Sequence, residues 1–267
     1  MEYTQDLEGL VESFDKEAEN YEHDTNTLHH KVQEYVILKN LEAELDGNKA
    51  LKILDSGGGI GRYSIILAKK GYEVVLSDIS EKSLEIAKRK MREEKLDFPI
   101  VCGNAEKTNF EDREFDFVMM NGGVVCYSPD AEQCFREANR ILRKKGILWF
   151  DFLNTLGWSI ELANVEMQTT IAGKDEYLIK MDDWDYAAKL FSIKHIEKML
   201  QRNGFKIKKE MGLMGIMHAL PLDIRYCHEY KPETLKKYMD IEYELSTRPE
   251  CVGNSWACIV CAEKEAL

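Results

Sequence analysis

The sequence feature that most constrains the fold is a glycine-rich turn that begins at Gly57. It follows a short apolar run at residues 51–54, which is typical of a buried strand. Apolar residues at helical spacing follow the turn at 65–68, and Gly71 marks the end of that helix. Glycine reaches positive φ at little cost and, without a Cβ atom, lets a ligand lie against the backbone. The amides at the start of the following helix point towards such a ligand.

The spacing of the glycines distinguishes between classes of nucleotide site. The dinucleotide fingerprint G-x-G-x-x-G/A fails in both registers, because its last position falls on Arg62 or on Ser64. The phosphate-loop pattern requires Gly-Lys-Ser/Thr, whereas Gly61 is followed by Arg62 and Tyr63. The pattern that fits is Asp-x-Gly-x-Gly-x-Gly over residues 55–61.

A second acidic residue indicates that the turn belongs to a nucleotide site. Residues 73–78 are predicted to form the next strand, with Asp78 at its end. Asp78 lies about 20 positions beyond the glycines, where a carboxylate accepts hydrogen bonds from both hydroxyls of a ribose.

Predicted strands and helices alternate through this part of the chain. Further strands are expected near residues 98–102, 115–121 and 147–152, with helices near 81–94 and 131–143. Such alternation predicts a parallel sheet with helices on both faces, and ligands then bind at the carboxyl ends of the strands. Asp55, Asp78, Asn104 and Asn121 all fall at such ends. One cleft is therefore expected to collect these four side chains.

Together these motifs resemble those of the class I S-adenosylmethionine (SAM)-dependent methyltransferases over roughly residues 50–153. The glycine turn resembles the first motif of that family, and residues 114–121 resemble its fourth strand. Asn104 stands where the family commonly has an aspartate that meets the adenine amino group, and its side-chain oxygen can accept the same hydrogen bond. Lys145 stands where the family usually has proline, in a turn before the fifth strand.

The resemblance implies both the fold and the cofactor. The implied fold is α/β, a doubly wound, seven-stranded and mostly parallel sheet whose last strand is antiparallel, with a helical N-terminal lid and cap insertions. SAM is the implied cofactor. The residues implied to bind it are Asp55, Ser56, Gly57, Gly58, Gly59, Gly61, Asp78, Ile79, Asn104, Ala105, Glu106, Asn121 and Gly122.

The same resemblance divides the chain into four segments. Residues 1–48 are expected to form the helical lid and residues 49–153 the SAM-binding core. Residues 154–190 are expected to form a cap insertion. Residues 191–267 complete the sheet and contain a further insertion at 212–250.

Aromatic and histidine side chains are the candidates for contact with the methyl acceptor. They are Tyr21, Tyr127, Trp184, His218 and His228. Tyr21 either closes over the cofactor or packs one N-terminal helix on the next. Tyr127 points either into the acceptor pocket or against the lid.

Two of the histidines are candidate bases, and an adjacent pair is expected to lie in solvent. His218 and His228 lie in the second insertion and are candidate general bases, with an ordinary surface or core role as the alternative for each. His29 and His30 are adjacent, so their side chains diverge on a helix. We expect these two to be a solvated pair, and we predict no metal site.

Charge and loop composition narrow the class of acceptor. Enzymes that methylate the amine of adenine or glutamine carry Asn/Asp-Pro-Pro-Tyr/Phe after the fourth strand, but Gly122 and Gly123 occupy the proline positions here. The formal net charge of −12 over 267 residues argues against a nucleic-acid groove, which needs a basic face, and against an anionic membrane surface. No apolar stretch approaches the length of a membrane span.

Cysteine usage suggests the compartment. Seven cysteines are spread thinly through the chain, and no leader peptide is visible at the acidic N-terminus. An odd number of scattered thiols is typical of reduced cysteines in the cytoplasm.

The function expected from the resemblance is methyl transfer from SAM to a small molecule by direct displacement. The sulfonium is already activated, so the protein mainly has to align the reacting groups. Segments rich in Tyr, Trp and Met predict a partly apolar acceptor. Two alternatives remain: a non-catalytic or regulatory SAM-binding protein of the same fold, and a nicotinamide-dependent oxidoreductase, against which the failed fingerprint argues. The acceptor, its reacting atom, the use of a base and the oligomeric state are left open.

Overall fold

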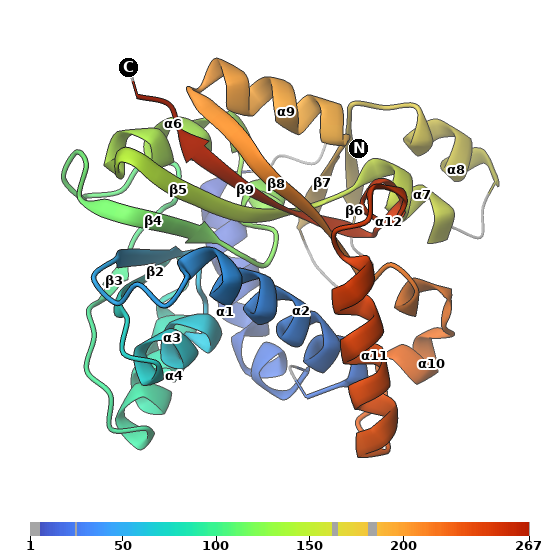
Figure 1. Cartoon of the computed structure of the whole chain (residues 1–267), viewed down its shortest axis with the longest axis horizontal. Helices are drawn as coiled ribbons and strands as arrows, with labels where there is room; N and C mark the ends of the chain where they lie inside the picture. Colours follow the sequence, from blue (N-terminus) through green and yellow to red (C-terminus); the bar gives the residue numbers. More distant parts are fainter. Residues whose placement is uncertain (1–5, 25, 162–164, 181–185, 267) are drawn as a thin grey trace.

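A seven-stranded sheet forms the centre of the molecule in a computed structural model that describes residues 6–24, 26–161, 165–180 and 186–266 (Figure 1). The strand order is β3-β2-β1-β4-β5-β9-β8. The strands are β1 (Lys52–Ser56), β2 (Glu73–Asp78), β3 (Ile100–Cys102), β4 (Phe115–Met120), β5 (Leu142–Leu153), β8 (Phe205–Leu213) and β9 (Ala257–Lys264). Strand β9 is antiparallel to both of its neighbours, whereas β1 to β5 pair in parallel. The predicted fold class is therefore confirmed.

Helices cover both faces of this sheet. The helices between strands are α3 (Arg62–Lys69), α4 (Glu81–Glu93), α6 (Ala131–Ile141) and α9 (Ile193–Arg202). In Figure 1, α6 and α9 lie above the sheet, whereas α3 and α4 lie below it. Side chains of the central strands are accordingly buried on both faces, and Phe117 and Trp149 pack together there with ring centroids 6.4 Å apart.

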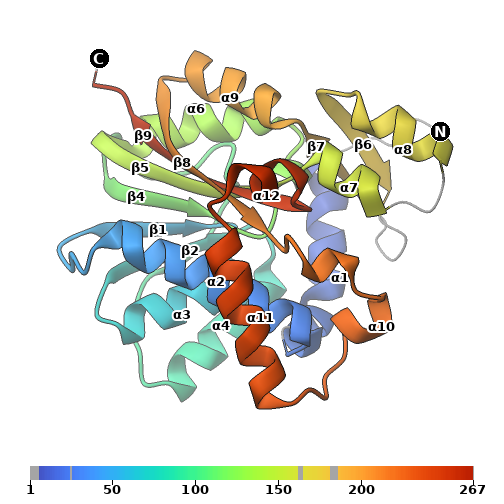
Figure 2. The same cartoon turned by 45° about the vertical axis from the view of Figure 1, so that its right-hand side comes forward.

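Two N-terminal helices join the lower layer. They are α1 (Leu7–Asp24) and α2 (Leu28–Leu45), and Thr27 caps α2 by accepting from the backbone N–H of His30. The insertion at residues 212–250 contains η1 (Met217–Ala219), α10 (Leu222–Arg225) and α11 (Pro232–Leu245), with the start of α12 (Pro249–Asn254). Figure 2 shows α11 lying beside α2, and the Leu28 N–H donates to the Cys227 carbonyl at 2.9 Å. The second insertion therefore packs against the N-terminal helices.

The segment at residues 154–190 has structure of its own. It holds α7 (Thr155–Glu161), α8 (Val165–Ala172) and a separate two-stranded antiparallel sheet of β6 (Glu176–Lys180) and β7 (Ala187–Phe191). Within the described ranges, no helix has both the length and the hydropathy needed to cross a bilayer.

The start of the fifth strand differs most from the prediction. The sequence predicts a turn before a strand at 147–152, whereas β5 already begins at Leu142. Leu142 pairs with Phe115, and the register then shifts by a bulge in which Lys145 has a φ of 61°. A bulge keeps these residues in the ladder while bending the strand, which is why a turn-like sequence continues as a strand.

The second insertion is anchored by the buried carboxylate of Glu242, on α11. This side chain is 1% exposed, and its oxygens accept from the backbone N–H groups of Gly215, Ile216 and Met217 at 2.7, 2.9 and 2.7 Å. These three amides belong to the turn that follows β8, where Met214 has a φ of 62°. Glu242 therefore fixes the path of the chain as it leaves the sheet.

We expect the Glu242→Ala variant to be less stable than the parent protein by about 2–4 kcal/mol, because it leaves the buried Met217 donor and the partly buried donors of Gly215 and Ile216 without their acceptor. Urea unfolding at neutral pH measures the difference. Glu244→Ala is the matched control, since Glu244 lies on the same helix in an exposed pair with Arg248, and such pairs contribute less than about 1 kcal/mol. Equal losses in the two variants would contradict the anchoring role.

Candidate functional site

The glycine turn packs closely against strand β2. The N–H groups of Gly57 and Gly58 donate to the Ser77 carbonyl at 2.7 and 3.1 Å. A Cβ atom at Gly58 would lie 2.5 Å from Leu76 Cδ1 and 2.6 Å from Asp55 Cγ, which leaves no room for a side chain. The sequence therefore folds here into a turn whose outer surface is bare backbone.

Asp78 connects this turn to the end of β2. Its Oδ2 accepts from the Gly59 N–H at 2.8 Å, and its Oδ1 accepts from the Ser80 N–H at 2.8 Å. The side chain is 8% exposed and borders a cavity, and burial raises its pKa. The prediction that the glycine turn and Asp78 lie together is confirmed.

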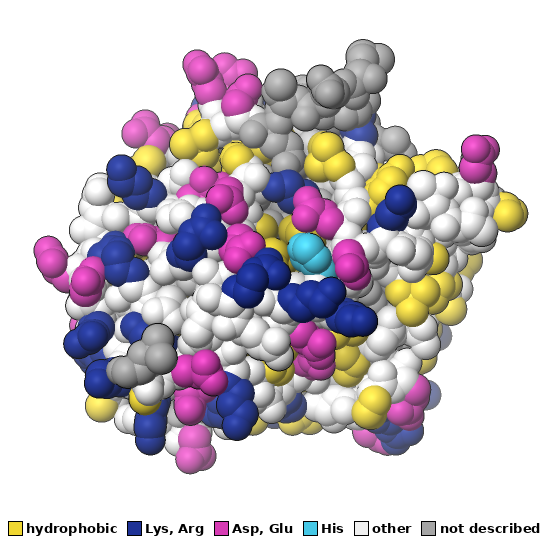
Figure 3. Space-filling model, turned by 90° about the horizontal axis from the view of Figure 1, so that it is seen from above, with side chains coloured by type: hydrophobic (Ala, Val, Ile, Leu, Met, Phe, Trp, Pro, Cys, Tyr) yellow, Lys and Arg dark blue, Asp and Glu magenta, His cyan; other side chains and the backbone are white. Residues whose placement is uncertain are grey.

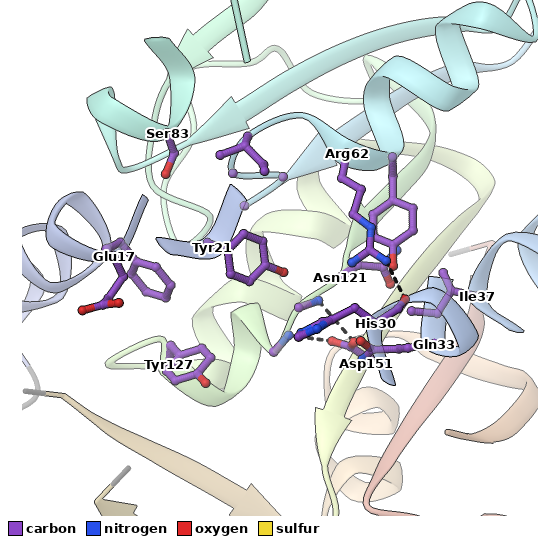
Figure 4. Close-up of a pocket in the computed structure, with 18 of the residues that line it drawn as sticks. Glu17, Tyr21, His30, Gln33, Ile37, Arg62, Ser83, Asn121, Tyr127 and Asp151 are labelled. Carbon is purple, nitrogen blue, oxygen red and sulfur yellow. Dashed lines mark hydrogen bonds between the residues drawn. The ribbon is translucent and has the colours of Figure 1, made fainter. Parts of the chain in front are cut away.

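A cavity of about 420 Å³ runs along the carboxyl ends of the strands (Figure 4). Its wall is formed by α1 and α2, the glycine turn, the loop after β4, the end of β5 and the start of β9. Residues that line it include Phe14, Tyr21, His29, His30, Gln33, Gly57, Gly58, Gly59, Arg62, Asp78, Asn121, Gly122, Gly123, Tyr127, Asp151, Leu153, Tyr226, Trp256 and Ala257.

A smaller cavity of about 80 Å³ adjoins the first. It shares Gly57 and Asp78 with the larger cavity and extends to Ile79, Asn104 and Ala105, beyond the ends of β2 and β3. The resemblance to the methyltransferase family implies that the adenine end of the cofactor binds at this position.

The structure brings most of the sequence-predicted residues to these two cavities. Those that line one or both are Tyr21, Gly57, Gly58, Gly59, Asp78, Ile79, Asn104, Ala105, Asn121, Gly122 and Tyr127. Those that line neither are Asp55, Ser56, Gly61, Glu106, His218 and His228. Trp184 lies outside the described residues.

Asp55 lies behind the glycine turn and is fully buried. Its Oδ2 accepts from the Ser64 hydroxyl at 2.6 Å, whereas Oδ1 has no hydrogen-bond partner among the described residues. Burial raises the pKa of this carboxyl to about 7, opposed in part by the Ser64 hydrogen bond. A buried acid with an unused oxygen next to a ligand-binding turn is typical of a functional position.

Glu106 lines neither cavity, and its carboxylate instead binds a neighbouring loop. Its carboxylate accepts from the Ser128 hydroxyl at 2.5 Å and from the Asp130 N–H at 2.9 Å. These bonds hold the segment after the short helix α5 (Val124–Tyr127).

Asp151 is a wall residue that the sequence reasoning missed. It lies in β5, is 3% exposed, and accepts from the N–H groups of Gly123 and Gly122 at 2.7 and 3.2 Å. Burial raises its pKa to about 6, opposed by these two hydrogen bonds. The signal that could have identified it is one acidic residue near the carboxyl end of the predicted strand at 147–152, in an otherwise apolar run.

Helix α1 forms one side of the cavity. Asp15 on this helix accepts from the Ser80 hydroxyl at 2.6 Å, so α1 is fixed to the start of α4. Phe14 packs edge-to-face on Tyr127 with centroids 5.5 Å apart. Tyr21, which borders the cavity, is 38% exposed. Figure 4 shows its hydroxyl directed into the space between the glycine turn and the loop after β4.

Helix α2 forms the adjacent side and corrects the expectation for the histidine pair. His29 is 2% exposed and lines the cavity, so it is not solvated as predicted. It stacks on Tyr226 with centroids 4.9 Å apart, and burial lowers its pKa well below the usual range. The carbonyl of His30 accepts from Arg62, whose Nε donates to Glu34 at 2.5 Å.

The two predicted bases are not in the wall of either cavity. Nδ1 of His218 accepts from the Arg225 guanidinium at 3.1 Å, and the His218 ring stacks on Trp256 with centroids 5.5 Å apart. Burial and the Arg225 charge lower its pKa to about 3. His228 is exposed. Within the described ranges, no group of three or more His, Cys, Asp or Glu side chains is arranged to hold a metal ion.

Comparison with known proteins identifies the domain. Residues 54–150 match the family described as a methyltransferase domain. The chain is similar to YqeM of Bacillus subtilis, which is named as a methyltransferase, with 34% identity over 47% of this chain and 50% of YqeM. It is 29% identical to the ubiquinone biosynthesis O-methyltransferase of Pelagibacter ubique, over 62% of this chain and 65% of that protein.

Two further similarities complete the comparison. A 23S rRNA (uracil(747)-C(5))-methyltransferase of Pyrococcus abyssi is 34% identical over 30% of this chain and 18% of its own length. The structure of a SAM-dependent methyltransferase of Thermotoga maritima superposes with a TM-score of 0.60 at 19% identity, covering 95% of this chain and 99% of that one. The chain thus spans 50% of the length of YqeM and 65% of that of the Pelagibacter ubique relative. It spans 18% of the length of the Pyrococcus abyssi enzyme.

These similarities agree with the geometry. The fold is that of the class I SAM-dependent methyltransferases, and residues 54–150 carry their methyltransferase domain. This family and fold imply SAM as the cofactor.

The buried acid Asp55 gives a pH-dependent prediction. Its pKa of about 7 in the folded protein lies above the ordinary value, so the penalty on its charged form is absent below about pH 4 and complete above about pH 7. Relative to Asp55→Asn, the parent protein should therefore lose stability as the pH rises through that window, by about 2–4 kcal/mol. Urea unfolding of both proteins across the window measures this, and parallel pH profiles would contradict it.

Proposed function

We propose that this chain, which carries a methyltransferase domain at residues 54–150, transfers a methyl group from SAM to a small-molecule acceptor by direct displacement. The observation that carries the proposal is the 2.8 Å hydrogen bond between the Asp78 carboxylate and the Gly59 amide at the edge of the cavity. This bond brings a bare backbone turn and a ribose-binding type of acid into direct contact. Those are the two elements that a nucleoside site requires.

The residues present fit SAM. The small cavity beside Ile79 and Asn104 suits the adenine, and the Asp78 carboxylate suits the ribose hydroxyls. Gly58 has no room for a side chain, so the turn stays open to the rest of the cofactor. When bound, SAM supplies a methyl carbon that is already activated by a positive sulfur.

The order of the strands separates a cofactor end from an acceptor end. Neighbouring strands are about 4.8 Å apart, so a ligand held at β2 and β3 extends across β1 towards β4. Asn121 and Gly122 follow β4. The rest of the cavity, beside Leu153 of β5 and Ala257 of β9, is then left for the acceptor.

The chemistry proposed for the protein is mainly alignment. Holding the nucleophile in line with the methyl group supplies most of what a displacement on sulfonium needs. Tyr21 and Tyr127 face the same space, and aromatic faces near a sulfonium favour its positive charge. Residues of α1 and α2 line this space, and we propose that these helices act as the lid predicted for residues 1–48 over the core predicted for residues 49–153.

A small acceptor is favoured over a nucleic acid. The net charge is −12, and Figure 3 shows basic and acidic side chains interspersed over the face above the sheet. Basic residues of α6 and α9 are paired there, as Arg140 is with Asp112 and Arg202 with Glu132. The relative that acts on rRNA matches 30% of this chain, whereas the ubiquinone biosynthesis enzyme matches 62%. These observations support a partly apolar metabolite as the acceptor.

The proposed location is the cytoplasm. All seven cysteines are free, from the exposed Cys102 to the buried Cys261. Unpaired thiols are typical of a reducing compartment.

Binding and turnover can be tested separately. Calorimetry with SAM and with its demethylated product, S-adenosylhomocysteine (SAH), measures binding, and labelled SAM with a metabolite panel measures transfer. Binding of both without transfer would favour the non-catalytic alternative. Binding of a nicotinamide dinucleotide in place of SAM would favour the oxidoreductase.

The role of Asp78 gives a direct prediction. Asp78→Ala removes a charged acceptor for the ribose hydroxyls, and hydrogen bonds to charged groups are worth about 1.5–3 kcal/mol each. We expect the dissociation constant for SAH to rise by about 10- to 100-fold.

Asp97→Ala is the matched control, because Asp97 is exposed and lines neither cavity. Far-UV circular dichroism verifies that both variants fold. An unchanged affinity of folded Asp78→Ala for SAH would contradict the cofactor assignment.

A further inference from the structure

The acceptor end of the cavity contains His29, to which the proposed methyl transfer assigns no role. We propose that His29 is the catalytic base that takes the proton of a hydroxyl on a flat aromatic ring, so that this site methylates a phenolic oxygen. The inference rests on the proposed methyl transfer and names the acceptor class for it.

The position of His29 is the first argument. Its ring lies 5.8 Å from that of Trp256, which directly precedes β9, and both line the cavity. Strand β9 is two strands beyond β4, which is roughly 10 Å along the edge of the sheet. Asp78, at the cofactor end, is on the opposite side of β4. His29 therefore borders the part of the cavity that is left for the acceptor.

The second argument is the state of its ring nitrogens. His29 is buried, and its Nδ1 has no hydrogen-bond partner in the part of the chain that the structure describes. The neighbouring histidines differ, because Nδ1 of His30 lies 2.7 Å from the Thr27 hydroxyl and Nδ1 of His218 lies 3.1 Å from Arg225. An enclosed polar atom without a partner costs about 1–3 kcal/mol. Because Nδ1 is enclosed, the nitrogen that can face an acceptor in the cavity is Nε2.

The third argument is charge. Burial lowers the pKa of His29 well below its usual range, and the neighbouring His30, His218, Arg225 and Arg62 lower it further. The ring is therefore neutral at physiological pH, so it can accept a proton but has none to donate as an acid.

A neutral imidazole of this kind selects the reacting group. The proton of a phenol becomes strongly acidic as its oxygen bonds to the methyl carbon, so even a weak base can take it. A neutral amine attacks with its lone pair and needs no base during the transfer. A thiol ionises near neutral pH without help. The hydroxyl is thus the acceptor that gains most from His29.

The walls favour a flat and uncharged acceptor. Tyr226 stacks on His29 at an interplanar angle of 27°, and Trp256 presents a second ring to the same cavity. Flat rings pack well against such faces. The Asp151 carboxylate in the same wall disfavours an anionic acceptor such as an aromatic acid.

The proposed step balances as follows. A lone pair of the phenolic oxygen forms the bond to the methyl carbon, and the carbon–sulfur pair stays on sulfur, which leaves SAH. The phenolic O–H bond breaks, and its proton passes to an imidazole nitrogen of His29. The imidazolium then returns the proton to water as the methyl ether leaves.

The test uses the full chain and His29→Phe, which keeps a flat ring against Tyr226 but removes both nitrogens. A first readout is binding to the SAH-loaded protein. We expect 2-naphthol to bind the parent protein about 3- to 10-fold more tightly than naphthalene, and this preference to disappear in His29→Phe. The affinity for SAH should stay within about twofold of that of the parent protein, which also verifies folding.

The second readout separates a base from a structural residue. His29→Phe should lower kcat for 2-naphthol by about 10²- to 10⁴-fold. It should change kcat for 4-nitrocatechol, whose first hydroxyl is already ionised at about pH 8.5, by less than about threefold. The Asp151 carboxylate should raise KM for this anion equally in the parent protein and the variant, so the comparison rests on kcat. His29→Gln is the second variant, and His228→Gln is the matched control, since His228 is exposed and lines neither cavity.

The possible results distinguish the two proposals. If the parent protein does not bind SAH, the proposed function fails. If it binds SAH but methylates neither phenol, the phenolic acceptor alone is overturned. If the His29 variants slow both phenols equally, or slow neither, the role as a base is overturned. The role of His29 as a base is also overturned if Asp151→Asn lowers kcat selectively for 2-naphthol and the His29 variants do not.

Discussion

The carboxylate of Asp78 is the interaction on which the rest of the site depends. Its two oxygens accept from the Gly59 and Ser80 amides, so one side chain ties the glycine turn to the start of α4. The turn itself is pressed against β2 so closely that Gly58 could carry no Cβ. Because the turn cannot move away from β2, the bare backbone and the acid stay in register. The contact between these two adjacent parallel strands therefore holds together the parts of the proposed nucleoside site.

Asp151 repeats this arrangement one strand beyond β4. Its carboxylate accepts from the Gly122 and Gly123 amides, just as that of Asp78 accepts from two amides, and burial raises the pKa of both groups. Burying a carboxylate costs free energy unless backbone donors satisfy it. Backbone N–H groups offset that cost for both acids, and each acid thereby fixes a glycine-containing loop. Both side chains also line the cavity. The two rigid loops define where a ligand lies between them.

Sequence reasoning found what local pattern determines. The glycine turn, the acid at the end of the next strand and the antiparallel last strand follow from spacing, alternation and family resemblance. His29 was expected in solvent because adjacent helical residues diverge, but Tyr226 and Trp256 enclose it from far along the chain. His218 was a candidate base because of its insertion, yet it packs on Trp256 outside the wall. Which face of a short helix is buried depends on distant segments, and no local pattern encodes that.

Similarity to other methyltransferases bears on the cofactor end of the cavity and not on its acceptor end. The matched region, residues 54–150, supplies the turn, Asp78 and the loop after β4, which together form the proposed cofactor end. His29, Tyr226 and Trp256, at the acceptor end, all lie outside that region. They come from α2, from the insertion at 212–250 and from the approach to β9. A shared core therefore predicts a shared cofactor, whereas the residues proposed to contact the acceptor lie outside that core. The choice of acceptor has to be inferred from these residues and their chemistry.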